Sequence, residues 1–183
     1  AYPNYNYGDV VNITATPANG WQFVNWTGDV ADPNSSSTSV TMNGDKTVTA
    51  NFAQITYTLT MAVTGSGSTT PGAGAYPNYH YGDVVNITAT PANGWQFVNW
   101  AGDVANPNSA NTSVTMNANK TVTANFSQIT HTLTVAVTGN GSTTPGPGAY
   151  PNYNYGDVVN ITATPANGCQ FVNWTGDVAD PNS

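Results

Sequence analysis

The sequence predicts a mainly β protein of tandem small antiparallel modules, each a sandwich or a β-grasp-like sheet with about five strands. Three observations support this fold class. Ala1-Tyr2-Pro3-Asn4-Tyr5 recurs at Ala75 and at Ala149, so the 183 residues repeat with a period of 74. Thr and Val, which are β-branched and favour extended backbone, fill the strand-like segments. No segment has helical periodicity, although Val104–Asn111 is expected to form at most one short turn of helix.

The repeats are nearly identical. Residues 1–74 and 75–148 differ at twelve positions, and residues 1–35 and 149–183 differ only at Trp21 and Cys169. The frame that puts turn-like segments at both boundaries gives one complete module, residues 56–129, between two partial ones. Residues 1–55 lack its first strand, and residues 130–183 lack its final hairpin. Open strand edges recruit other strands, so we expect a longer array or head-to-tail strand exchange to complete the partial modules.

The first half of the module contains one clear strand. Apolar residues alternate with small or polar ones over residues 57–64, and this period of two marks a half-buried strand. Its inward-facing residues are predicted to be Tyr57, Leu59, Met61 and Val63. Gly65-Ser66-Gly67-Ser68 is expected to end the strand in a turn. Thr69 to Gly82, rich in Pro, Gly and Tyr, is predicted to be a long ordered loop.

The second half alternates strands with turns. Asp83–Thr90 is predicted to be a strand with Val85, Ile87 and Ala89 on one face. A tight turn at residues 91–94 then leads into a third strand, because Pro presets one central position and Asn-Gly accepts positive φ. The predicted elements that follow are the strand Trp95–Trp100, a loop over 102–111, and a hairpin of Ser113–Met116 with Thr121–Phe126.

The block from Gly94 to Trp100 marks the centre of each module. It recurs at residues 20–26 and 168–174, and the three copies hold all five tryptophans. The spacing of Trp100 from Phe97 requires a bulge or places the two rings on opposite faces. We expect Phe23, Phe97 and Phe171 to be the safest core residues, with Trp26, Trp100 and Trp174 as deep anchors. Since Cys169 replaces the first tryptophan in one copy, Trp21 and Trp95 are expected partly at a surface or module seam.

Composition excludes several classes of partner. The formal net charge is −7, and Lys46 and Lys120 are the only basic residues besides two histidines. Nucleic-acid binding and docking to anionic lipid both need clustered cations. The chain has no such cluster, so neither nucleic acid nor an anionic lipid surface is expected as a partner. No apolar run approaches the ~20 residues that span a bilayer, so no membrane insertion is expected in this segment. The surface, rich in Thr, Asn, Gly, Ser and Tyr, is typical of exported bacterial repeat proteins and predicts an extracellular or cell-surface location.

Five sequence blocks in fixed order carry a family resemblance. They are Tyr-Thr-Leu-Thr at 57–60, Gly-Asp-Val-Val-Asn-Ile-Thr-Ala-Thr-Pro at 82–91, Gly-Trp-Gln-Phe-Val-Asn-Trp at 94–100, Ser-Val-Thr-Met at 113–116 and Lys-Thr-Val-Thr-Ala-Asn-Phe at 120–126. Together they resemble the divergent internalin B B-repeat family of bacterial secreted and surface-anchored proteins. The resemblance implies export, tandem arrangement and a role as stalk, spacer or adhesive segment. It implies no catalytic residues.

Acidic loop residues are weak candidates for a calcium site. Asp and Asn oxygens can bind Ca²⁺, but the same residues are ordinary in polar turns. Asp32 of the first repeat is also replaced by Asn106 in the middle repeat. The turn interpretation is favoured, and no other cofactor is expected. The calcium candidates are Asp29, Asp32, Asp103, Asp177 and Asp180.

Each repeat also carries a tyrosine cluster. Exposed aromatic side chains can pack within the module, pack against the next module or bind glycans, and the two packing roles are favoured. The candidates for an interface or a glycan site are Tyr2, Tyr5, Tyr7, Tyr76, Tyr79, Tyr81, Tyr150, Tyr153 and Tyr155.

No catalytic group is apparent. His80 and His131 have no His or Cys partner at metal-ligand spacing, and Cys169 is the only cysteine. Lys46 and Lys120 raise the hypothesis of an internal isopeptide bond, but a lysine that keeps a turn soluble is the favoured interpretation. We therefore predict a non-enzymatic extracellular structural protein, a stalk or self-assembling filament whose partner is itself, as a head-to-tail homopolymer or a continuing tandem array. The alternative is an adhesin or carbohydrate-binding segment of a large bacterial surface protein.

Overall fold

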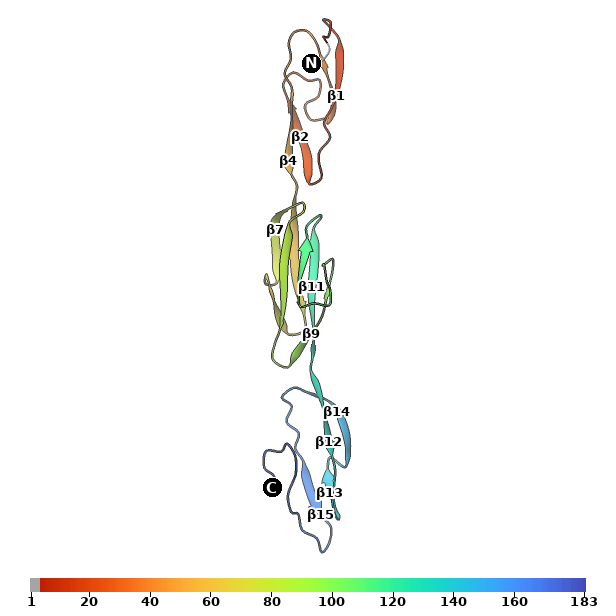
Figure 1. Cartoon of the computed structure of the whole chain (residues 1–183), viewed down its shortest axis with the longest axis vertical. Helices are drawn as coiled ribbons and strands as arrows, with labels where there is room; N and C mark the ends of the chain where they lie inside the picture. Colours follow the sequence, from red (N-terminus) through yellow and green to blue (C-terminus); the bar gives the residue numbers. More distant parts are fainter. Residues whose placement is uncertain (1–3) are drawn as a thin grey trace.

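The computed structural model describes residues 4–183, which contain fifteen strands and no helix. The mainly β prediction is therefore confirmed, and the expected helical turn near Val104–Asn111 is not formed. The strands fall into three groups that follow one another along the long axis of the molecule (Figure 1).

The two outer groups consist of paired strands. In the first, β1 (Val10–Thr14) pairs with β3 (Ser37–Thr41), and β2 (Trp21–Thr27) pairs with β4 (Thr49–Gln54). In the last, β12 (Thr130–Val135) pairs with β14 (Gly148–Asn154), and β13 (Gly141–Thr144) pairs with β15 (Thr162–Pro165). All four pairs are antiparallel.

The central group is a sandwich of two sheets. One sheet has the order β7-β5-β11-β9 and the other β10-β8-β6. Within the first sheet β5 and β11 are parallel, and every other pair in the sandwich is antiparallel. The strands are β5 (Thr56–Thr64), β6 (Gly67–Thr70), β7 (Gly74–His80), β8 (Val84–Pro91), β9 (Trp95–Ala101), β10 (Asn111–Thr115) and β11 (Lys120–Gln128).

Alternating side chains from both sheets form the core between them. The predicted inward faces are confirmed: Leu59 and Met61 of β5 are buried, as are Ile87 and Ala89 of β8. Apolar side chains at every second position of a strand lie on one face, so each strand contributes a row of residues to the core. The buried cluster consists of Leu59, Met61, Ile87, Ala89, Trp100, Val114, Met116, Val122, Ala124 and Phe126.

The central module has more strands than the sequence suggested, seven rather than about five. The predicted loop from Thr69 to Gly82 is wrong, because it contains the end of β6 and all of β7. Pro, Gly and Tyr gave this segment the composition of a loop. β7 lies at the edge of its sheet and pairs only with β5, and an edge position tolerates Pro77 because its missing N–H is not needed there.

The predicted hairpin of Ser113–Met116 with Thr121–Phe126 is also wrong. β10 pairs with β8 in one sheet, whereas β11 pairs with β5 and β9 in the other. The connection between them crosses from one sheet to the other. The strand pattern did not reveal this, because Val114 and Val122 are both buried in the same core but reach it from opposite sides.

A β-bulge explains the spacing of the aromatic residues on β9. Phe97 pairs with Phe126 and Asn99 pairs with Asn125, which leaves Val98 without a partner across the ladder. The extra residue turns Trp100 to the same face as Phe97, and their ring centroids lie 5.9 Å apart. Of the two alternatives that the spacing allowed, a bulge or rings on opposite faces, the bulge is therefore confirmed.

The tryptophan at the end of the block is the deeper anchor in the first and central groups, where Trp26 and Trp100 are buried, whereas Trp174 is only half-buried. Trp100 is 2% exposed, and its Nε1 donates a hydrogen bond to the carbonyl of Ser109 at 3.0 Å. Phe97 is only half-buried, so the expectation that the phenylalanines are the safest core residues is wrong. Trp21 is 41% exposed and Trp95 is half-buried, as the replacement by Cys169 suggested.

Candidate functional site: the seams between modules

One residue links each group of strands to the next. Ile55 separates β4 from β5, and Ile129 separates β11 from β12. The N–H of Ile55 donates to the carbonyl of Gly20 at 2.7 Å, and the N–H of Ile129 donates to the carbonyl of Gly94 at 2.8 Å. The link is therefore tied to the Asn-Gly turn of the module that precedes it.

The same two glycines contact the module that follows. A Cβ built on Gly20 would lie 2.3 Å from the Cβ of Tyr81, and one built on Gly94 would lie 2.9 Å from the ring of Tyr155. Both glycines have positive φ, at 78° and 77°, as a tight turn of this kind requires. Glycine thus serves two purposes here: it allows the turn, and it leaves room for a tyrosine of the next module.

The exposure of the third tyrosine in each cluster reflects this contact. Tyr81 and Tyr155 are 48% and 53% exposed, whereas Tyr7, for which the described residues 4–183 provide no equivalent glycine turn, is 87% exposed. At the other end, Gly168 has φ 79° but no atom of another residue within 4 Å of its hypothetical Cβ. The tyrosine and the glycine are thus the two halves of one repeated contact.

The other tyrosines pack mainly inside their own modules. The hydroxyl of Tyr76 donates to the carbonyl of Gly72 at 2.9 Å, and that of Tyr150 donates to Gly146 at 2.8 Å. Tyr76 and Tyr79 lie against the central core, and Tyr153 is half-buried. Tyr5 is exposed, and Tyr2 lies outside the described residues. The hydroxyls of Tyr76 and Tyr150 thus bond to their own modules, whereas Tyr81 and Tyr155 contact the preceding one, and an interface or glycan role of the cluster stays a prediction.

The calcium candidates make hydrogen bonds and ion pairs with the protein itself. Asp29 forms an ion pair with Lys46, and Asp103 forms the equivalent pair with Lys120. The side chain of Asp32 accepts from the N–H of Asn34 at 2.9 Å, and that of Asp180 accepts from Asn182 at 3.0 Å. Asp177 occupies the same repeat position as Asp103. Residues 4–183 hold no cluster of three or more His, Cys, Asp or Glu, and a calcium site stays a prediction.

Sequence reasoning missed the role of the two lysines. Lys120 begins β11 rather than sitting in a hairpin turn, and its side chain is largely covered while its partner Asp103 is exposed. The signal was present in the sequence, since Asp and Lys stand at the same separation in both repeats. Ile55, Ile129, Gly20 and Gly94 were likewise not recognised as seam residues, because their partners at the seam are distant in the sequence.

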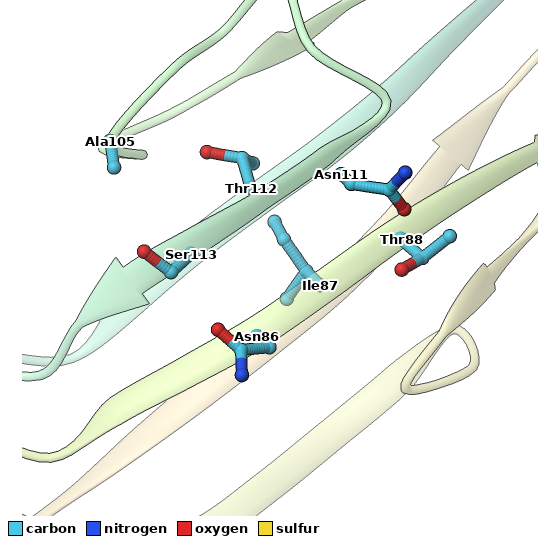
Figure 2. A pocket seen from close by; sticks show the side chains of 7 residues that line it. All are labelled: Asn86, Ile87, Thr88, Ala105, Asn111, Thr112 and Ser113. Carbon is cyan, nitrogen blue, oxygen red and sulfur yellow. The ribbon is translucent and has the colours of Figure 1, made fainter.

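A shallow hollow of mixed polarity lies on the central module between β8, β10 and the loop before β10. Figure 2 shows the side chains that line it: Asn86, Ile87, Thr88, Ala105, Asn111, Thr112 and Ser113. The loop is held over β10 by hydrogen bonds from Ala105 N to Ser113 O and from Asn106 N to Thr112 Oγ1, both at 2.9 Å. The lining combines amides and hydroxyls without an aromatic ring or a charge. No histidine is among its lining residues. The backbone N–H of His80 donates to Asp83 Oδ2 at 2.7 Å, and the ring of His131 lies 6.4 Å from that of Tyr155.

Comparison with known proteins gives the family. In residues 4–183 no helix is long and apolar enough to cross a membrane. Searches of curated proteins and of solved structures found no match. The family model described as the divergent InlB B-repeat domain matches residues 1–56, 57–130 and 131–183. Repeats of this type occur in bacterial surface proteins, and the family is generally non-enzymatic. The chain therefore belongs to the divergent InlB B-repeat family.

Proposed function

We propose that the chain is a structural segment of an extracellular bacterial surface protein, a stalk whose modules keep a fixed orientation. The observation that carries this proposal is the seam, which recurs with the same residues at both junctions. A long linker rich in Gly and Ser would let the modules rotate freely. Here a single isoleucine connects two strands and is itself hydrogen-bonded to the preceding module.

Packing at the seam adds to this restraint. The tyrosine of the following module lies on the glycine turn of the preceding one, so bending at the junction would open that contact. Domains joined by small interfaces usually move relative to one another. A hydrogen bond and an aromatic contact on either side of a one-residue link oppose such motion, which is the property that a stalk needs.

Small-angle X-ray scattering of the dilute chain tests the proposal. The wild-type chain is expected to scatter as an extended rod, and the double variant Tyr81→Ala, Tyr155→Ala should give a broader distribution of interatomic distances. Tyr7→Ala is the matched control, since Tyr7 occupies the same repeat position and is 87% exposed. A wild-type chain as flexible as the double variant would overturn the stalk proposal.

Two related roles are tested alongside it. For the filament version, near-identical modules offer near-identical contacts that can propagate head to tail, and negative-stain images showing only globular particles would contradict it. For glycan binding, the observation in favour is the exposure of Tyr5 and Tyr7. Glycan-array binding that is lost in Tyr5→Ala, Tyr7→Ala but kept in Ser68→Ala would support that role, and absence of array binding would contradict it.

A further inference from the structure

The glycine turn at each seam contains an Asn-Gly pair, Asn19-Gly20 at the first junction and Asn93-Gly94 at the second. Both asparagines are exposed, and both glycines are half-buried. Neither the N–H of Gly20 nor that of Gly94 donates to a backbone carbonyl among residues 4–183. Each turn therefore combines an accessible side-chain amide with a backbone nitrogen that is not engaged in such a hydrogen bond.

An Asn-Gly pair can modify itself without an enzyme. The backbone nitrogen of the glycine attacks the side-chain Cγ of the asparagine, the C–N bond of the side-chain amide breaks, and ammonia leaves with the proton that the nitrogen gives up. Glycine favours the attack because it has no Cβ to hinder it. Water then opens the cyclic imide at either carbonyl carbon. Cleavage of the new Cγ–N bond gives aspartate, and cleavage of the original peptide bond gives isoaspartate, in which the backbone runs through the side chain.

The shape of the seam turn opposes this reaction. Positive φ at Gly94 but not at Asn93 is the pattern of a type II turn. Such a turn sets ψ of the asparagine at about +120°, which directs the nitrogen of the glycine away from the asparagine side chain. The peptide group between the two residues must therefore rotate before the imide ring can close, and that rotation displaces Gly94.

The link and the following module hold the turn in this shape. The carbonyl of Gly94 accepts the N–H of Ile129 at 2.8 Å, and a Cβ on Gly94 would lie 2.9 Å from the ring of Tyr155. At the first seam Ile55 and Tyr81 make the equivalent contacts. A rotation that displaces the glycine would disturb both contacts at its seam. The seam must therefore open before the ring can close.

We propose that Asn19 and Asn93 are sites of spontaneous deamidation, which the closed seams protect and which react when a seam opens. The inference rests on the proposed structural role, because the fixed seam is what withholds the reaction. Isoaspartate at residue 93 adds a carbon atom to the backbone just before Gly94, so the carbonyl that accepts from Ile129 is displaced. Each conversion also adds a carboxylate to a chain of net charge −7. Prolonged opening of a seam thus becomes permanent.

Conversion of the two sites can be measured separately in the full-length chain. A lysine-specific protease cuts after Lys46 and Lys120, so Asn19 and Asn93 fall in different fragments. Tandem mass spectrometry of these fragments locates the modified residue during incubation at mildly alkaline pH. Each site should convert at least roughly tenfold more slowly in the folded chain than in the same chain unfolded in guanidinium chloride, because only the open fraction reacts. Equal rates in the two states would overturn the proposal.

A substitution at one seam should act on that seam alone. Tyr155→Ala should speed the conversion of Asn93 several-fold and leave Asn19 unchanged. Tyr81→Ala should have the reverse effect, so each variant contains its own control. Tyr155→Phe keeps the ring against Gly94 and should keep the wild-type rates. No change at the seam that has lost its tyrosine would contradict the proposal, and so would an equal rise at both sites, which would place the protection in the fold as a whole.

Small-angle scattering shows whether the modification loosens the seam. Wild-type chain that is aged until both sites have converted should give a broader distribution of interatomic distances than fresh chain. The variant Asn19→Gln, Asn93→Gln, aged in the same way, should keep the fresh distribution, because glutamine would have to close a larger ring and does so far more slowly. Equal distributions for the aged wild type and the aged variant would refute the loosening. Fresh chain alone tests the stalk proposal, so failure here leaves that proposal standing.

Discussion

Gly20 and Tyr81 are in contact across the first seam, with no room for a side chain between them. A Cβ on Gly20 would lie 2.3 Å from the Cβ of Tyr81. Gly20→Ala should therefore strain the turn, by about 1–2 kcal/mol for an alanine at positive φ, and also push the second module away. We expect a lower melting temperature together with a broader distribution of interatomic distances in small-angle scattering.

The third repeat supplies the control for this variant. Gly168→Ala places alanine at nearly the same positive φ, but nothing lies within 4 Å of the new methyl group. It should show the backbone strain without any change in scattering. If Gly20→Ala and Gly168→Ala alter the scattering equally, the seam contact does not set the orientation of the modules.

Trp100 should carry far more of the stability than Trp21. Trp100 is almost fully buried and hydrogen-bonded through its indole, so Trp100→Ala should cost about 3–5 kcal/mol of unfolding free energy. Trp21→Ala should cost much less, because that side chain is partly in solvent already. Urea unfolding followed by circular dichroism measures both, and similar losses for the two variants would contradict the assignment of Trp100 as the deep anchor.

A buried hydroxyl on β6 offers a stabilising substitution. Thr69 is buried, and its Oγ1 has no hydrogen-bond partner among the described residues. An unsatisfied buried hydroxyl costs about 1–3 kcal/mol, and valine has nearly the same shape. Thr69→Val should therefore raise the melting temperature, whereas Ser68→Ala at the neighbouring exposed position should leave it unchanged. A decrease for Thr69→Val would indicate that a water molecule satisfies the hydroxyl.

The Lys120–Asp103 contact should behave as an ordinary surface ion pair. Asp103 is 74% exposed, and exposed pairs are worth about 0–1 kcal/mol. Lys120→Gln is therefore expected to lower the unfolding free energy by less than about 1 kcal/mol, and added salt should reduce the difference further. Intact-mass spectrometry should give the full mass of the sequence. Loss of a water molecule would instead indicate an isopeptide bond and contradict the ionic assignment.

Local patterns predicted much of the module. The alternation in β5 and β8 placed Leu59 and Ile87 in the core correctly, because a period of two fixes which side chains share a face. The bulge at Val98 was anticipated as one of two alternatives from the spacing of Phe97 and Trp100. These features depend on residues close together in the sequence.

The features that were missed depend on distant residues. β7 forms because β5 offers it an edge, which its own composition of Pro, Gly and Tyr does not indicate. The assignment of β10 and β11 to different sheets follows from their partners and not from the turn between them. Gly94 was recognised as a turn residue, but the space it leaves for Tyr155 is visible only when two modules are placed together.

The parallel pairing of β5 with β11 has a mechanical consequence. β5 is the strand by which the chain enters the central module and β11 is the strand by which it leaves, and the two are direct neighbours over six residue pairs. Tension along the chain would pull the start of one strand and the end of the other in opposite directions. All the hydrogen bonds between them would then be sheared together instead of being opened one after another. The module is therefore expected to resist force applied along the long axis of the molecule, on which the neighbouring modules also lie.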